Sequence, residues 1–566
     1  MLSDARELPD GAELEGDVCI VGAGAAGLAV ARALIRTPLR IILLEGGGLQ
    51  FESDTQSLYE GPVAGVPYFP LDTARLRFFG GSTNHWGGIC RRFDPSDFER
   101  RDWIPGSGWP IGLADVEPYY SAARELVQLP TDDWDVDQWE EEDELEAFPR
   151  SDRMATRVSQ IVPKSKRSFG SAYSRELEAA ETVRCYLHAN VVEIDTNEAA
   201  SAVTKLRVAT LTGKRMSVAA RYFVLATGGI ENPRLLLASN RRRPNGLGND
   251  HDLVGRYFIE HPRFEAGVLA PARRTLQAGF YEAHHVEGTE IQGYLALPFD
   301  VQRSEQLVDV QLLMDPVYDP RFERALESDD VDSLESLVQD RGGGSIGDFG
   351  SNLMKVVGDL TTGRRFTVPG APLPVPHPDV VRKLVASPEV VRDSIPDLLG
   401  NIAGFSYKRA VGAAPLDAIT IRSRIDQAPN RDSRVTLVRE RDALGMPRAR
   451  LDWRLSELDR HSAVRTMEII GAAVARAGLG RLRVMVDADD RSWPTDLAGG
   501  YHHMGTTRMS DAPETGVVDG ACRVHGIANL FVAGSSVFTT GGSSTPTLTI
   551  VALALRLADH LKRIAA

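Results

Sequence analysis

The chain has 566 residues, too many for one compact core, so we expect two domains. Its hydrophobic share of 43% and charged share of 25% are ordinary for a globular protein. The formal net charge of −14 argues against nucleic-acid binding, because a phosphate backbone requires a basic protein face.

The first ordered segment, residues 17–45, has the pattern strand, tight turn, helix, strand. An apolar run at 18–21 leads into the turn Gly22-Ala23-Gly24-Ala25-Ala26-Gly27, a helical composition follows, and a second apolar run covers 39–44. This is the order of elements in a dinucleotide-binding unit, with the helix N-terminus facing the phosphates.

Four residues of this segment have separate expected roles. Gly22 permits the turn, Gly24 lets backbone N–H groups approach a pyrophosphate, and Gly27 lets the helix pack closely on the strand. Glu45 ends the second strand, where a carboxylate accepts both hydroxyl hydrogens of a ribose. The motif predicts a dinucleotide site but does not by itself separate FAD from NAD.

Residues 75–93 form the next unusual segment. The pairs Gly80-Gly81 and Gly87-Gly88 flank a cluster of Asn84, His85 and Trp86. Paired glycines on both sides indicate backbone that lies close to a flat ligand and presents this cluster to it. The alternative is a tight surface loop.

The middle of the chain returns to the first sheet and then leaves it. Residues 184–194 and a stretch ending at 221–229 read as strands, and we expect Pro233 to open the helix that follows. Alternating residues within 263–325 predict antiparallel strands. Residues 324–391 read as an insertion over a pocket mouth or at an oligomer contact, and the sequence does not choose between these.

The last third of the chain contains two more strands, a long helix and a dense C-terminal segment. We expect the strands at 417–424 and 434–438 and an amphipathic helix over 455–477. The segment YHHMGTTRM at 501–509 precedes a strand that ends at Gly534, and a glycine- and hydroxyl-rich turn then leads into a final helix. The C-terminus therefore repeats the strand, turn and helix of the N-terminus.

The cysteines and the remaining histidines suggest no disulfide framework and no metal site. No cysteine pair has CxxC spacing, and Cys19 and Cys185 are expected to be small buried hydrophobes. Four other histidines lack ligand spacing: His251, His261, His284 and His285. With no signal-like N-terminus and no apolar run long enough to span a membrane, we expect a cytoplasmic protein.

Several blocks together resemble the glucose-methanol-choline (GMC) oxidoreductase family, in particular its branch of pyranose oxidases and sugar dehydrogenases. The blocks, in the family's order, include VGAGAAG, GGSTNHWGG, ATGGIENPRLLLAS, VGRYFIEHP, HHMGTTRM and NLFVAGSSVFTTGG. The resemblance implies an α/β (α+β) fold, in which a Rossmann-like FAD-binding domain is interleaved with a substrate domain built on an antiparallel sheet with helices. It places the FAD-binding domain at 1–95, 181–265 and 495–566, and the substrate domain at 96–180 and 266–494.

The resemblance also implies roles for single residues. His502 falls at the family's active-site histidine, which accepts the hydroxyl proton while hydride leaves for flavin N5, and His503 is expected to support it. Thr545 stands before Pro-Thr, where the family usually has Asn or His, and a hydroxyl is no comparable base. The expected FAD contacts are Gly22, Gly24, Ala26, Gly27, Glu45, Gly81, Asn84, His85, Val192, Gly534, Ser535, Pro546 and Thr547.

His85 aligns with the histidine that pyranose oxidases join covalently to their flavin. Here Gly87-Gly88 replace the family's more polar pair, and many relatives with His-Trp bind flavin without a bond. We therefore expect non-covalent FAD, with a covalent link through His85 as the alternative.

The resemblance implies oxidation of an alcohol on a sugar, a glycoside or an aminoglycoside-like molecule, with oxygen or another compound as the electron acceptor. The negative net charge slightly favours an amine-bearing sugar. Two alternatives stay open: oxidation of a sterol, polyol or aromatic alcohol, and a non-catalytic flavoprotein that binds a partner. The first motif alone would also permit a nicotinamide dehydrogenase.

Overall fold

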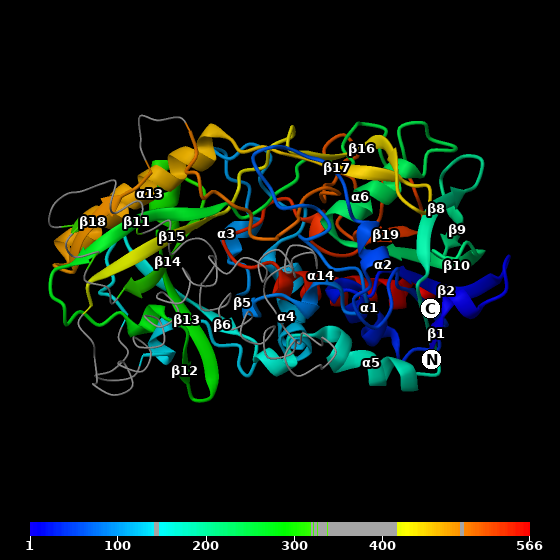
Figure 1. Cartoon of the computed structure of the whole chain (residues 1–566), viewed down its shortest axis with the longest axis horizontal. Helices are drawn as coiled ribbons and strands as arrows, with labels where there is room; N and C mark the ends of the chain where they lie inside the picture. Colours follow the sequence, from blue (N-terminus) through cyan, green and yellow to red (C-terminus); the bar gives the residue numbers. More distant parts are fainter. Residues whose placement is uncertain (141–146, 318–320, 322–324, 327–336, 338–415, 487–491) are drawn as a thin grey trace, which may run out of the picture.

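The computed structural model describes residues 1–140, 147–317, 321, 325–326, 337, 416–486 and 492–566. Figure 1 shows an elongated molecule with one large sheet toward each end and helices between them. The two chain termini lie close together beside the first sheet (Figure 1). The expected insertion at 324–391 falls almost entirely outside the described residues.

The first sheet has a parallel centre and an antiparallel edge. The strand order is β1 (Leu2–Asp4), β7 (Val183–Leu187), β3 (Ile41–Leu44), β2 (Glu13–Val21), β10 (Arg215–Leu225), β9 (Val203–Ala209) and β8 (Asn190–Thr196). The eighth strand, β19 (Leu530–Val532), pairs with β10. Val18 to Val21 and all of β3 are buried, as expected of parallel strands that are covered on both faces. Because β19 joins the same sheet, the last hundred residues complete the unit that the first fifty begin.

Three helices cover this sheet next to the first turn. They are α1 (Ala25–Leu34), α14 (Thr547–Ala565), which packs on α1, and α4 (Leu113–Val127), which packs on α14. The other helices of the described residues are α2 (Ser53–Ser57), α3 (Pro95–Phe98), α5 (Phe169–Ala179), α6 (Gly228–Ala238), α7 (Phe299–Glu305) and α13 (Glu457–Arg476).

The second sheet is antiparallel throughout, and α13 packs on it. Its order is β18 (Gly480–Val484), β11 (Arg263–Pro271), β15 (Ala418–Ile425), β14 (Val310–Val317), β13 (Thr289–Ala296), β6 (Ala155–Ile161) and β5 (Ile89–Cys90), with β12 (His284–Val286) on β13. A small third sheet contains β16 (Arg434–Arg441), β17 (Pro447–Trp453) and β4 (Val63–Gly65). The mixed fold, with a Rossmann-like unit and an antiparallel sheet, is confirmed.

Two local predictions differ from the structure. Residues 184–194 form the separate strands β7 and β8, because His188 has a φ of 56° and breaks the extended run. The helix α6 begins at Gly228 rather than at Pro233, which lies inside it. The side chain of Asn232 accepts hydrogen bonds from the backbone N and the hydroxyl of Thr227, at 2.9 and 2.6 Å, and so stabilises this earlier start.

All four cysteines are buried and free, and the burial predicted for Cys19 and Cys185 is confirmed. Within the described part of the chain, no helix is both long enough and apolar enough to cross a bilayer.

Candidate active site

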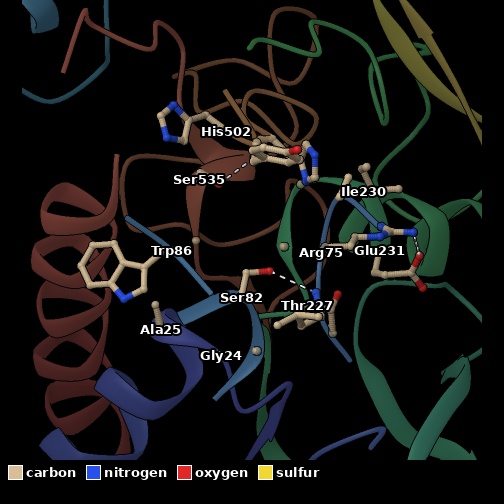
Figure 2. A pocket seen from close by; sticks show the side chains of 18 of the residues that line it. Gly24, Ala25, Arg75, Ser82, Trp86, Thr227, Ile230, Glu231, His502 and Ser535 are labelled. Atoms are coloured by element: carbon tan, nitrogen blue, oxygen red, sulfur yellow. Dashed lines mark hydrogen bonds and ion pairs between the residues drawn. The ribbon is translucent and has the colours of Figure 1, made fainter. Parts of the chain in front are cut away.

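A cavity of about 720 Å³ lies between the first and second sheets. Its walls come from the first glycine turn, the segment after β4, the start of α6, the strands β11 and β15, and the C-terminal segment. In Figure 2, His502 and Ser535 lie at one end of the pocket, Gly24 and Ala25 at the other, and Trp86 stands across from Arg75 and Glu231. Residues from both ends of the chain therefore share one cavity.

The glycine turn leaves open space at one position only. Gly22 has a φ of +99°, and a Cβ there would lie 2.7 Å from the carbonyl oxygen of Ala226. A Cβ on Gly27 would lie 1.9 Å from the carbonyl oxygen of Gly22, so neither glycine can carry a side chain. Gly24, in contrast, lines the cavity and has no atom within 4 Å of its Cβ position. This cradle fits a pyrophosphate.

Two helices begin at the cavity without a side-chain cap. The residue before α1 is Gly24 and the residue before α14 is Pro546, and neither helix start receives a side-chain hydrogen bond. Ala25 and Thr547, the first residues of the two helices, both line the cavity. Free N–H groups and the positive end of each helix dipole favour an anion or an electron-rich ring at these positions.

The carboxylate of Glu45 is fixed beside the glycine turn. It accepts hydrogen bonds from the backbone N–H groups of Ala23 and Gly47, at 2.8 and 2.9 Å, and its side chain lines the cavity. Its place at the end of β3 is the one from which a carboxylate binds a ribose. The glycine cradle, the uncapped helices and Glu45 together fit FAD.

Most of the expected cofactor contacts line this cavity: Gly22, Gly24, Ala26, Glu45, Gly81, His85, Gly534, Ser535, Pro546 and Thr547. The other three lie outside the lining. Gly27 packs against the turn, Asn84 donates to the carbonyl oxygens of Phe79 and Gly81 at 3.0 Å each, and Val192 packs on the hydrophobic core. Val191, its neighbour, lines the cavity instead.

His85 and Trp86 face the cavity from the loop between the two glycine pairs. The indole of Trp86 donates to the carbonyl oxygen of Arg167 at 2.8 Å, which fixes its orientation. Burial lowers the pKa of His85 to about 4, so this imidazole is neutral at physiological pH.

His502 stands in the cavity wall and contacts a second histidine. Its Nδ1 atom lies 2.6 Å from Nδ1 of His261, and its backbone N–H donates to the carboxylate of Glu260 at 2.8 Å. Burial, and then the positive charge that His261 would carry, lower the pKa of His502 well below its usual value. The ring is therefore neutral at physiological pH.

The contacts of His261 determine which nitrogen of His502 carries the proton. Nε2 of His261 lies against the carbonyl oxygen of Gly542, which only accepts, so this nitrogen carries hydrogen. Burial lowers the pKa of His261 to about 3, so its Nδ1 keeps a lone pair. The proton between the two rings then belongs to Nδ1 of His502. Nε2 of His502 is left with a free lone pair, which is the form of imidazole that accepts a proton.

Glu260 connects these groups, and it is fully buried. Its carboxylate accepts the hydroxyl of Tyr68 at 2.5 Å and the backbone N–H groups of His261, Gly500 and His502 at 2.7, 2.7 and 2.8 Å. Because one carboxylate bonds both histidine segments, it holds the imidazole pair in one geometry. No sequence pattern assigned a role to Tyr68, Glu260 or His261, although the last two belong to the block VGRYFIEHP.

His503 and Thr545 line the cavity but are engaged elsewhere. Nε2 of His503 lies 2.8 Å from the hydroxyl of Tyr68, and since that hydroxyl donates to Glu260, the imidazole is the donor. The hydroxyl of Thr545 donates to the carbonyl oxygen of Ile89 at 2.6 Å. Nε2 of His502, in contrast, has no hydrogen-bond partner among the described residues, so its lone pair is free to accept a proton.

Two family models match the chain. The model described as FAD dependent oxidoreductase matches residues 17–245, and the one described as GMC oxidoreductase matches residues 429–554. The chain is 24% identical to 2-methyl-1,2-propanediol dehydrogenase of Mycolicibacterium austroafricanum, over 97% of this chain and 95% of that protein. It is 23% identical to the fructose dehydrogenase large subunit of Gluconobacter japonicus, over 97% and 98% of the two chains.

The fold is also similar to that of a solved flavoenzyme structure. Pyridoxine 4-oxidase from Mesorbium loti matches with a TM-score of 0.50 and 17% identity, over 97% of this chain and 99% of that one. The family models cover the glycine cradle, Glu45 and the segment of His502, which are the parts of the cavity described above. The chain is an FAD-dependent oxidoreductase, and its C-terminal part matches the GMC oxidoreductase family.

Proposed function

We propose that this enzyme oxidises a secondary or primary alcohol of a sugar, a glycoside or a related polyol, with His502 as the base. The observation that carries the proposal is the tautomer of His502, whose Nε2 is left free by the contact with His261. A neutral imidazole in a closed site is a suitable acceptor for a hydroxyl proton.

Different residues of the chain have different roles in the reaction. The bound flavin supplies the acceptor for the hydride that leaves the substrate carbon. Nε2 of His502 takes the hydroxyl proton, and Glu260 keeps the imidazole in place through the backbone of the same residue. Thr545 contributes through its hydrogen bond to Ile89, which holds the start of α14 at the cavity.

The names of the relatives support an alcohol on a small hydroxylated molecule. One relative is named for a diol and another for fructose. An alcohol without sugar-like hydroxyl groups, such as a sterol or an aromatic alcohol, remains the alternative within the same chemistry.

We further propose that 1–95, 181–265 and 495–566 form the FAD-binding domain, with 96–180 and 266–494 as the substrate domain. In support, the parallel strands and the glycine cradle come from the first set, and most strands of the second sheet come from the second. We propose that FAD is held without a covalent bond to His85. Acid precipitation tests this: a colourless pellet under a yellow supernatant is expected, and a yellow washed pellet would contradict it.

The test of function is a substrate panel on the purified yellow holoenzyme. Sugars, glycosides, polyols and aromatic alcohols are assayed with an artificial electron acceptor and, separately, with oxygen. We expect turnover of at least one hydroxylated sugar-like compound, and its loss in His502→Ala that keeps its flavin. Turnover restricted to sterols or aromatic alcohols would contradict the proposal.

A further inference from the structure

The substrate-side wall of the cavity contains two successive cross-strand pairs from β11 and β15. Glu265 is opposite Arg422, and Arg263 is opposite Arg424. All four residues line the cavity, so both pairs are on the same face of the sheet. Their Cβ atoms are near neighbours by the geometry of an antiparallel pair.

The two pairs differ in charge. Arg422 donates to the carboxylate of Glu265 at 2.8 Å, which is the arrangement expected of opposite residues in a sheet. In the other pair two positive charges are opposite each other, and each raises the energy of the other. Unlike the first pair, this pair has no carboxylate opposite its arginine.

Neither arginine of the like-charged pair has a carboxylate partner among the residues described. Arg424, which is 9% exposed, donates to the amide oxygen of Gln311 at 3.2 Å. The guanidinium of Arg263 lies 5.8 Å from the ring centre of Tyr501. Burial and the charge of Arg263 lower the pKa of Arg424 to about 10, which leaves it charged at neutral pH. Several N–H donors of the pair are therefore left for a ligand.

The nearby carboxylates are already engaged. Glu260 accepts four hydrogen bonds, Glu265 is paired with Arg422, and Asp496 accepts the backbone N–H of Glu265 at 2.8 Å. None of them forms an ion pair with Arg263 or Arg424 in the described structure. Both arginines face the cavity, where a ligand can supply the counter-charge that the described residues do not provide.

This pair is close to the reacting position. Arg263, Arg424 and His502 line the same cavity, and the guanidinium of Arg263 lies over the ring of Tyr501, the residue before His502. A ligand held by the pair would therefore reach His502 with another part of the same small molecule.

We propose that Arg263 and Arg424 form a subsite for a carboxylate of the substrate, so that the alcohol oxidised at His502 belongs to a hydroxylated acid such as a uronic or aldonic acid. The planar guanidinium matches a carboxylate through two parallel N–H···O bonds. A cationic aminoglycoside is repelled by the same pair, which goes against the preference suggested by the net charge. This inference rests on the proposed function and specifies its substrate.

The test uses substrate pairs in which a carboxylate of the acid replaces one hydroxymethyl group of the neutral compound. Methyl glucoside is compared with methyl glucuronide, and glycerol with glycerate, on the holoenzyme with an artificial acceptor. The binding of each compound is measured separately by calorimetry. The variants are Arg424→Gln, Arg263→Gln and the conservative Arg424→Lys. The control is Arg273→Gln, which removes an exposed arginine shortly after the end of β11.

We expect the acid of at least one pair to have the higher kcat/KM and the tighter binding. Arg424→Gln should lower kcat/KM and affinity for the acid by about 10- to 100-fold while changing those for the neutral partner much less. Arg424→Lys should restore part of the difference, and Arg273→Gln should leave it unchanged.

The outcomes separate this inference from the proposed function. If neutral sugars are oxidised as well as acids, and Arg424→Gln lowers both equally, the carboxylate subsite is wrong and the proposed function stands. If acids bind through the arginine pair but no compound is oxidised, the subsite stands and the proposed function fails. If acids neither bind more tightly than neutral compounds nor react faster, the subsite is overturned.

Discussion

The Nδ1 atoms of His502 and His261 lie 2.6 Å apart, although 241 positions separate the two residues in the chain. One proton lies between the two rings, and the carbonyl oxygen of Gly542 decides to which ring it belongs. The proposed base, His502, is thus oriented by His261, a neighbour whose two ring nitrogens are both engaged in contacts.

The first prediction concerns His261 as a positioning residue. His261→Ala removes the acceptor for Nδ1 of His502, so that either nitrogen of His502 can carry the proton. We expect kcat to fall by about 10- to 100-fold with FAD retained. The acid limb of the kcat profile should move up in pH, because water replaces the second ring and reduces the burial that lowers the pKa of His502.

The matched variant is His261→Gln, whose amide can accept from His502 and donate to the carbonyl oxygen of Gly542. It should recover part of the lost rate and return the acid limb toward that of the native enzyme. A rate loss with an unmoved pH profile in both variants would mean that His261 only fills space.

The second prediction concerns Thr545. Its hydroxyl proton is committed to the carbonyl oxygen of Ile89, so Thr545→Val should lose one buried hydrogen bond, worth about 1 kcal/mol of stability. The measurements are the melting temperature, which should fall, and the pH profile of kcat, which should keep its shape. A change in the number of ionisations in that profile would show that Thr545 takes part in proton transfer.

The third prediction compares two glycines of the first turn. Gly24→Ala meets no atom within 4 Å, so the protein should fold, but the added methyl group occupies the cofactor cradle and the flavin content should fall severalfold. Gly27→Ala would place a Cβ 1.9 Å from the carbonyl oxygen of Gly22 and should prevent folding. Absorbance at the flavin band and the melting temperature check both.

Gly112→Ala is the control, because Gly112 also has open space at its Cβ position and lies outside the cavity. It should retain full flavin content. If Gly24→Ala bound FAD as well as this control does, the cradle would not hold the pyrophosphate.

Features of the fold and the site that depend on residues close together in the chain could be predicted from the sequence, and features that join distant segments could not. The glycine turn could be predicted because Gly22 and Gly27 contact each other across the turn and the apolar runs directly flank it. The contacts among Tyr68, Glu260 and His502 join segments that no local pattern connects, so the carboxylate that organises the site was not found.

The sequence also did not predict which side chains face the cavity. Val192, an expected cofactor contact, lies outside the cavity lining, and β8 has a register shift between Val191 and Glu193. Such an irregularity changes which residues face the cavity, and a one-residue change exchanges the two faces of a strand. Asn84 lies at the predicted loop, yet it hydrogen-bonds the loop itself rather than facing the cavity.

The fourth prediction concerns pH and a buried acid. Burial, and then the negative charges of Asp94 and Asp426, raise the pKa of Asp97 to about 8. Between the unfolded pKa near 4 and this value, the folded state holds a proton that the unfolded state has lost, so stability falls as pH rises. Asp97→Asn removes this dependence.

The difference in stability between Asp97→Asn and the native enzyme should grow by up to about 1.4 kcal/mol per pH unit from pH 5 to pH 8. Melting temperatures of both proteins across this range provide the measurement. Asparagine can keep the bond from the backbone N–H of Asp94, which is 2.8 Å long in the native protein. A difference that stays constant from pH 5 to pH 8 would mean that Asp97 is ionised in the folded state, because neither state would then exchange a proton in this range.

We propose above all that both ends of the chain enclose one FAD, with His502 as the base. The most direct measurement mixes the holoenzyme with its alcohol substrate without oxygen and follows the flavin absorbance in a single turnover. We expect rapid bleaching in the native enzyme and bleaching slower by about 10²- to 10⁴-fold in His502→Ala at equal flavin content. Equal rates in the two proteins would contradict it.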